Sequence, residues 1–215
     1  MNLITNIFKK AKHQKSSQPK TNIYLLATLI FETAQKITSL LNEYILKSFP
    51  EGSQEYLQMQ TKIFFEVATF CAHLASRIAL KEFGHEKRQI LNDHIGQLLI
   101  EYTVTRFYKP ASNDSHFKIP VEFKDKFYNY LNQSEHEYGS CRAWILKEDE
   151  DVAFADKFVS GVKSKGMLNL LTDNIVKILN NYNPVSYHLI MGKIISSLNV
   201  KEFENSVLMT QNELQ

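Results

Sequence analysis

The sequence predicts an all-α protein, a helical bundle of about seven helices in which three long antiparallel helices are followed by shorter ones. Two observations on pattern point to this fold class. Apolar residues recur at helical spacing over several long stretches, and no run of four or more residues alternates β-branched or aromatic with polar side chains between hairpin turns. The third observation is compositional. With 7 glycines and 5 prolines among 215 residues, the chain lacks the turn residues that β folds need.

The first long helix is expected over residues 21–49. Apolar or small side chains recur there at alternating steps of four and three, namely Ile23, Ala27, Ile30, Ala34, Ile37, Leu41 and Tyr44. Such a heptad row predicts one continuous apolar face on a helix, and Pro50 and Gly52 end the helix. Two interpretations of the row stay open at this point: a surface for self-association, or the inner face of the chain's own core.

The second long helix is expected between an N-cap at Ser53 and a C-cap at Gly84. Its apolar row consists of Tyr56, Ile63, Val67, Phe70, Leu74 and Ile78. The opposite side carries polar and charged residues that are mostly four apart: Lys62, Glu66, Thr69, His73 and Arg77. This spacing predicts a solvated face on which ion pairs join successive turns.

The third long helix is expected from Glu86 to Tyr108, and its buried row would be Leu91, Ile95, Leu98 and Tyr102. A loop over 111–119 follows. Shorter helices are then expected after Pro120, over 169–181 and 184–198, and from Val200. We expect residues 21–215 to form a single domain, with a sub-boundary near 110–119 as the alternative.

Residues 1–20 differ from the rest of the chain in their charge. They hold five lysines and no acid, which leaves a net charge of −3 for the remaining 195 residues: Lys9, Lys10, Lys12, Lys15 and Lys20. On a helix, Leu3, Ile4, Ile7 and Phe8 would form one apolar face beside these lysines. The pattern favours a short terminal arm, and the alternative is an anchor in which the lysines bind an anionic surface such as a membrane.

Several function classes have no support in the sequence. The glycine-rich loops that bind nucleotide phosphates do not occur, and Glu82 with His85 is the only Glu-x-x-His pair. No His-x-x-x-His spacing exists, and the two cysteines, Cys71 and Cys141, are too few for a four-cysteine zinc site. We therefore expect no metal, no cofactor and no transmembrane segment, and a reducing, cytoplasmic location.

One segment has an enzymatic likeness. Arg88 is followed six residues later by His94, and this pair resembles the Arg-x4-6-His motif of the HEPN ribonucleases, which are all-α bundles of comparable size. The resemblance implies that His94 acts as a general acid or base on the RNA 2′-hydroxyl and that Arg88 neutralises the charge on the phosphate.

The sequence as a whole favours a different function. It offers helical faces and no group of converging catalytic residues, and its formal net charge of +2 creates no field that would draw it to nucleic acid. We therefore predict a non-catalytic interaction or regulatory module that binds a protein partner or a second copy through helical faces. The ribonuclease that uses Arg88 and His94 is the alternative.

Overall fold

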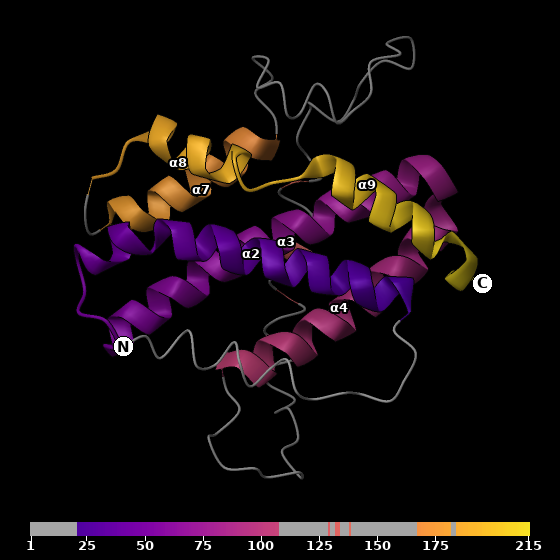
Figure 1. Ribbon diagram of the computed structural model, residues 1–215, viewed down its shortest axis with the longest axis horizontal. Helices are drawn as coiled ribbons and strands as arrows, with labels where there is room; N and C mark the ends of the chain where they lie inside the picture. The colour runs from indigo at the N-terminus through magenta and orange to yellow at the C-terminus, as the bar shows by residue number, and fades with distance from the viewer. Residues whose placement is uncertain (1–20, 108–128, 130–131, 134–137, 139–166, 182–183) are drawn as a thin grey trace.

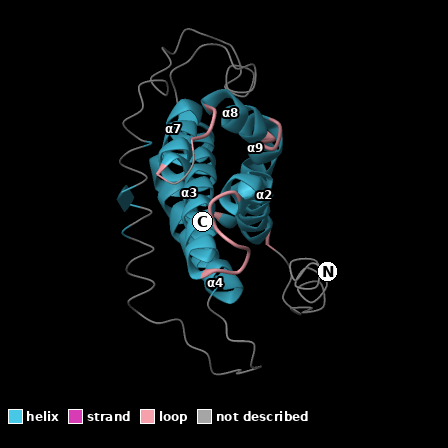
Figure 2. Cartoon of the chain, turned by 90° about the vertical axis from the view of Figure 1, so that its left-hand side faces the viewer, coloured by secondary structure: helices cyan, strands magenta, loops and turns pink. Residues whose placement is uncertain are grey.

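The protein is an all-α bundle in which three long helices pack together and shorter helices follow (Figures 1 and 2). A computed structural model describes residues 21–107, 129, 132–133, 138, 167–181 and 184–215. Within these residues the helices are α2 (Asn22–Leu46), α3 (Gln54–Phe83), α4 (His85–Phe107), α7 (Met167–Asn180), α8 (Tyr187–Ile195), α9 (Val200–Met209) and the 3₁₀ helix η2 (Thr210–Glu213). The predicted fold class is confirmed.

Helix α2 begins and ends close to where the sequence predicts. The hydroxyl oxygen of its N-cap, Thr21, accepts a hydrogen bond from the backbone N–H of Tyr24 at 3.2 Å. All seven residues of the heptad row are buried, with at most 8% of any side chain exposed. The row is therefore the inner face of α2 within its own chain. Self-association through other helical faces stays a prediction.

Helix α3 is the central element of the bundle. Its N-cap at Ser53 and its C-cap at Gly84 are confirmed, and α3 contacts α2, α4, α7 and α9. Among the described helices it is the one that is long and apolar enough to cross a membrane. Because 78% of its most apolar window is buried inside the bundle, those side chains contact neighbouring helices.

The prediction of a solvated face on α3 is wrong for three of its five residues, since Lys62 is exposed and Arg77 half-buried. Glu66, Thr69 and His73 expose only 7%, 2% and 4% of their surface, and Ser76, one turn further along, exposes 2%. These four residues, which we call the polar stripe of α3, follow each other at steps of three, four and three and so lie on one side of the helix. They are buried because α4 covers one end of this side, and Tyr138 and α7 cover the other.

The chain turns from α3 into α4 at a single residue, Gly84. Its φ of 83° and ψ of −177° form a backbone conformation that essentially only glycine adopts. The Gly84 N–H donates to the Leu80 carbonyl of α3, and the Gly84 carbonyl accepts from the N–H of Arg88 on α4. Gly84 is therefore hydrogen-bonded to both helices. The turn fixes where the first residues of α4 lie beside the end of α3.

The buried row of α4 differs in part from the prediction. Leu91 and Ile95 are buried as expected, whereas Leu98 and Tyr102 are half-buried. Leu99 is buried in place of Leu98. Tyr102 instead packs edge-on against Tyr24 and Phe31 of α2, at ring-centroid distances of 5.7 and 5.5 Å.

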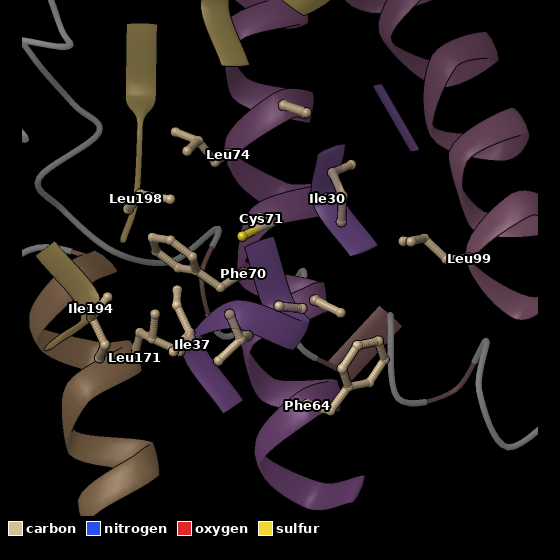
Figure 3. Close-up of a cluster of buried hydrophobic side chains, with 14 of the residues drawn as sticks. Ile30, Ile37, Phe64, Phe70, Cys71, Leu74, Leu99, Leu171, Ile194 and Leu198 are labelled. Carbon is tan, nitrogen blue, oxygen red and sulfur yellow. The ribbon is translucent and has the colours of Figure 1, made fainter. Parts of the chain in front are cut away.

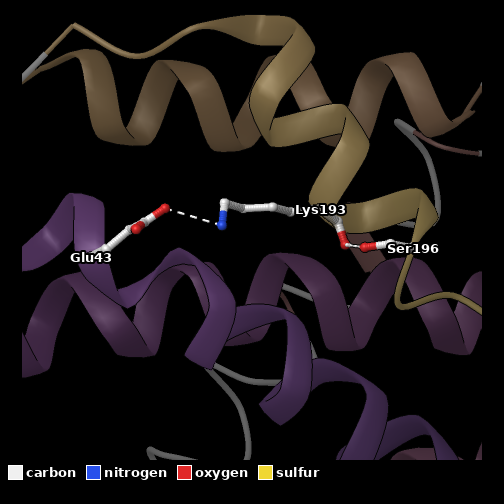
Figure 4. Close-up of polar contacts among 3 residues, drawn as sticks. All are labelled: Glu43, Lys193 and Ser196. Carbon is white, nitrogen blue, oxygen red and sulfur yellow. Dashed lines mark hydrogen bonds and ion pairs between the residues drawn. The ribbon is translucent and has the colours of Figure 1, made fainter.

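The shorter helices close the bundle around α2 and α3. Side chains from α2, α3, α4 and α7 meet those of Ile194 and Leu198 in one core (Figure 3). The Lys193 ammonium of α8 lies 3.0 Å from the Glu43 carboxylate of α2 (Figure 4). This hydrogen bond, with the lysine charge, lowers the pKa of Glu43. Because the pair is solvent-exposed, it orients α8 more than it stabilises the fold.

The two ends of the described chain meet at the start of α2. The Glu213 carboxylate accepts hydrogen bonds from the backbone N–H groups of Asn22 and Ile23, at 2.7 and 3.1 Å. The Asn22 side-chain amide donates to the Met209 carbonyl at 3.0 Å. A carboxylate at a helix N-terminus is favoured by the unpaired N–H groups and by the helix dipole. This cap attaches α9 and η2 to α2.

Some sequence predictions concern residues that the structure does not describe. The arm with its five lysines, Lys9, Lys10, Lys12, Lys15 and Lys20, lies outside the described residues. So do the loop at 111–119 and most of the segment from Pro120 to 166. The helices predicted over 169–181 and 184–198 correspond to α7 and α8, and the one from Val200 corresponds to α9.

Two glycine substitutions should have opposite effects on stability. Replacing Gly84 with Ala forces a Cβ into a left-handed conformation, so we expect the free energy of unfolding to fall by about 1–3 kcal/mol. Gly192 lies inside α8 with no atom within 4 Å of an added Cβ, so Gly192→Ala should raise it by about 0.5–1 kcal/mol. Urea denaturation of both variants measures the two changes. Equal effects at the two positions would contradict the role given to Gly84.

Candidate functional site

A polar pocket lies between α3 and α4. Its volume is about 480 Å³, and among the described residues one outside these helices, Asn132, reaches it. Four lining residues come from α3 and seven from α4: Thr69, Ala72, His73, Ser76, Arg88, Gln89, Asn92, Asp93, Ile95, Gly96 and Leu99. We call this cavity the α3–α4 pocket. The polar stripe of α3 forms its floor, because Thr69, His73 and Ser76 all belong to both sets.

Ser76 connects the two helices at the pocket. Its buried hydroxyl oxygen accepts hydrogen bonds from Nε of Arg88 at 2.8 Å and from the side-chain amide of Asn92 at 3.1 Å. Arg88 and Asn92 are one turn apart on α4, so both donors approach the same oxygen. Ser76 therefore holds the guanidinium group of Arg88 in a fixed orientation at the pocket wall.

His73 is a neutral residue at the pocket floor. Its Nε2 accepts a hydrogen bond from Nε of Arg77 at 3.1 Å, which places the ring proton on Nδ1. Burial, with the positive charges of Arg77 and Arg88, lowers the pKa of His73 to about 3. Its ring packs against Tyr138 at a centroid distance of 6.1 Å. The imidazole is thus uncharged throughout the physiological pH range.

The polar stripe begins one turn before the pocket, at Glu66. Its carboxylate accepts hydrogen bonds from the hydroxyl of Tyr138 at 2.5 Å and from the side-chain amide of Asn174, on α7, at 2.8 Å. Tyr138 is fully buried and also packs edge-on against Phe70, at 5.7 Å between ring centroids. Glu66 therefore joins α3 to α7 and to Tyr138, next to the pocket floor.

The structure separates the two residues of the Arg-x4-6-His resemblance. Arg88 lines the α3–α4 pocket, whereas His94 is exposed on α4 and is not among the lining residues. The pocket therefore does not bring the two side chains together. Among the described residues, the histidine that shares the pocket with Arg88 is His73, from the preceding helix.

Sequence reasoning missed most of the pocket residues. It placed Thr69 and His73 on a solvated face, and it gave no role to Ser76 and Asn92. One signal was present in the sequence: the steps of three, four and three from Glu66 to Ser76 put the stripe on one helical side. The pattern does not tell whether that side contacts water or another helix.

Two further observations limit the chemistry of the described residues. The residues that the structure describes contain no group of three or more His, Cys, Asp or Glu side chains that could hold a metal ion. Cys71 is a fully buried free thiol, and burial raises its pKa well above the ordinary value. A thiol in this state is a small apolar core residue and a poor nucleophile.

No protein-family model matches this chain, and neither the curated proteins nor the solved structures include a match to it.

The neutral state of His73 should make stability depend on pH. Its pKa is about 3 in the folded protein and near 6.5 when unfolded, so between these values the unfolded chain binds the proton more strongly. Stability is then lost as the pH falls below 6.5, by up to about 1.4 kcal/mol per pH unit. In His73→Gln this contribution is absent. The free energy of unfolding, measured by urea denaturation from pH 7 to pH 4, should therefore depend less on pH than in the wild type. His94→Gln, at the exposed histidine, is the control and should follow the wild type. Parallel profiles for all three proteins would contradict a neutral, buried His73.

Proposed function

We propose that the protein is a non-catalytic regulatory module that binds a small polar molecule in the α3–α4 pocket. The observation that carries the proposal is a cavity of about 480 Å³ in which hydrogen bonds to the buried Ser76 hydroxyl already orient polar side chains of the wall. Sites for small molecules have this size, combine apolar walls with a few fixed polar groups, and are largely formed before the ligand arrives. Fixed donors also lower the entropy cost of binding.

The state of the pocket side chains favours binding over catalysis. A general acid or base works best when its pKa lies near the operating pH, and the pKa of His73 is about 3. The hydroxyl oxygen of Ser76 accepts two hydrogen bonds, which lowers its electron density and makes it a poor nucleophile. The other two described lining residues with such groups are Asp93, which is exposed, and Thr69, whose hydroxyl donates to backbone carbonyls of its own helix.

A blocking variant tests the proposal. We expect members of a panel of small polar compounds, comprising neutral, cationic and anionic ones, to shift the backbone amide NMR signals of α3 and α4 around the pocket. Ala72→Leu adds three carbon atoms at the pocket wall and should abolish these shifts. Gln97→Leu introduces the same side chain, without added bulk, at an exposed position of α4 outside the lining and should leave them intact. Shifts that survive Ala72→Leu, or a panel without any shift at the pocket, would overturn the proposal.

The HEPN-like ribonuclease that uses Arg88 and His94 is the second candidate. The observation that favours it is the position of Arg88 on a polar pocket, where a guanidinium could contact a phosphate. This function requires that the wild type degrades total RNA and that His94→Ala does so about 10²- to 10⁴-fold more slowly. Equal survival of the RNA with both proteins rejects the ribonuclease and leaves the binding module in place.

A further inference from the structure

We infer that the ligand of the α3–α4 pocket is a neutral amide, and that Asn92 and Ser76 recognise the carbonyl and the N–H that an amide carries side by side. This inference rests on the proposed function and specifies the chemical class of its ligand. Three features of the described residues support it: the anchoring of Asn92, the unused hydroxyl proton of Ser76, and the apolar walls beside these two polar groups.

Asn92 is held in place while most of its hydrogen-bonding capacity stays unused. Its side-chain amide donates to the Ser76 hydroxyl oxygen at 3.1 Å, and within the described part of the chain this is the one hydrogen bond of that side chain. An asparagine side chain carries two N–H donors and a carbonyl oxygen that accepts. One N–H and the carbonyl oxygen of Asn92 therefore stay available. Because Asn92 is half-buried and lines the pocket, a ligand there can reach both.

Ser76 adds a second donor at the same place. Its oxygen accepts from Arg88 and from Asn92, so its own hydroxyl proton is left to donate. None of the residues that the structure describes accepts a hydrogen bond from this hydroxyl. Ser76 exposes 2% of its surface and lines the pocket. A buried donor without a partner destabilises the fold, and a carbonyl oxygen of a ligand would satisfy it.

Together, the two side chains present donors next to an acceptor. The donors are the Ser76 hydroxyl and the remaining N–H of Asn92, and the acceptor is the carbonyl oxygen of the same Asn92 amide. An amide ligand matches this set, because its carbonyl accepts and its N–H donates; asparagine pairs with the edge of adenine through two such bonds. A carboxylate would place its oxygens against the Asn92 carbonyl, and an amidinium would place its N–H groups against the donors. Either charged group would therefore leave part of the set without a partner.

The walls beside these polar groups favour an uncharged ligand with an apolar body. Apolar residues from both helices form them, and two of these expose only 2% and 1% of their surface, namely Ile95 and Leu99, beside Ala72 and Gly96. Burying an ion against such side chains costs far more free energy than burying a neutral amide that keeps its hydrogen bonds. A ring that carries an amide group meets both requirements of the pocket.

The test compares four compounds that share one ring and differ in their polar group: benzamide, benzoate, benzamidinium and acetophenone. Each is titrated into the full chain at pH 7, and the backbone amide NMR signals of α3 and α4 are followed. Benzamide offers a donor and an acceptor, benzoate and acetophenone offer only acceptors, and benzamidinium offers only donors. We expect benzamide to bind at least about fivefold more tightly than each of the other three.

Asn92→Asp should change this preference. Aspartate has nearly the same shape as asparagine, but it offers acceptors in place of the N–H donors, and Ser76 would donate to it. Relative to the wild type, we expect benzamide to bind at least about fivefold more weakly and benzamidinium at least about fivefold more tightly. Misfolding cannot produce such a gain of affinity. Asn205→Asp makes the same change at an exposed position of α9 outside the lining and should alter each affinity by less than about twofold.

The outcomes separate this inference from the proposed function. Binding of benzoate, benzamidinium or acetophenone to the wild-type pocket that is as tight as that of benzamide, or tighter, overturns the inference and leaves the proposed function intact. An Asn92→Asp variant that keeps the wild-type order of the four compounds has the same consequence. If none of the four binds at the pocket, the inference fails, and the proposed function fails with it only if the wider panel of polar compounds also gives no shift there.

Discussion

The burial of α3 on nearly every side is the constraint on which the rest of the structure depends. A helix in this position has to be apolar over most of its surface, and α3 meets that requirement with residues such as Phe64, Phe70 and Leu74. It also carries four polar residues in succession, from Glu66 to Ser76. Because a polar group that loses water without gaining a hydrogen bond destabilises the fold by about 1–3 kcal/mol, each of the four needs a partner inside the protein.

Those partners determine how the other elements are arranged. Thr69 bonds to the backbone of its own helix, at the Phe65 carbonyl, and so links α3 to nothing else. Glu66 and Ser76 each accept two hydrogen bonds from elsewhere, which attach Tyr138 and α7 at one end of the stripe and α4 at the other. The α3–α4 pocket lies where the second attachment is made. Its donors are oriented because the same hydrogen bonds that satisfy the buried stripe also fix the side chains of α4.

The sequence predicts the fold well wherever a local pattern determines the outcome. The heptad row of α2, the N-cap at Ser53 and the C-cap at Gly84 each depend on a few neighbouring residues, and all three are confirmed. The burial of the polar stripe depends on tertiary contacts, which a local sequence pattern does not show. Glu66 and His73 stand four or three apart from other polar residues, as they would on a solvated face, and only contacts with distant elements bury them. Arg88 was a candidate because of its spacing to His94, yet its partner in space is Ser76, twelve residues before it.

The position of the pocket also explains how a ligand there could have a regulatory effect. Helix α4 is connected to α3 by a single residue, Gly84, and it packs on α2 and α3. A ligand that contacts Asn92 on α4 and the floor formed by α3 would therefore bridge the two sides of this turn. A ligand that binds only the folded state raises the free energy of unfolding by RT ln(1 + [L]/Kd). Occupancy of the pocket would therefore stabilise the packing of α4 on α2 and α3. Under the proposed function, a ligand bound between two core helices would thus couple its concentration to the stability of the whole bundle, without requiring any catalytic group.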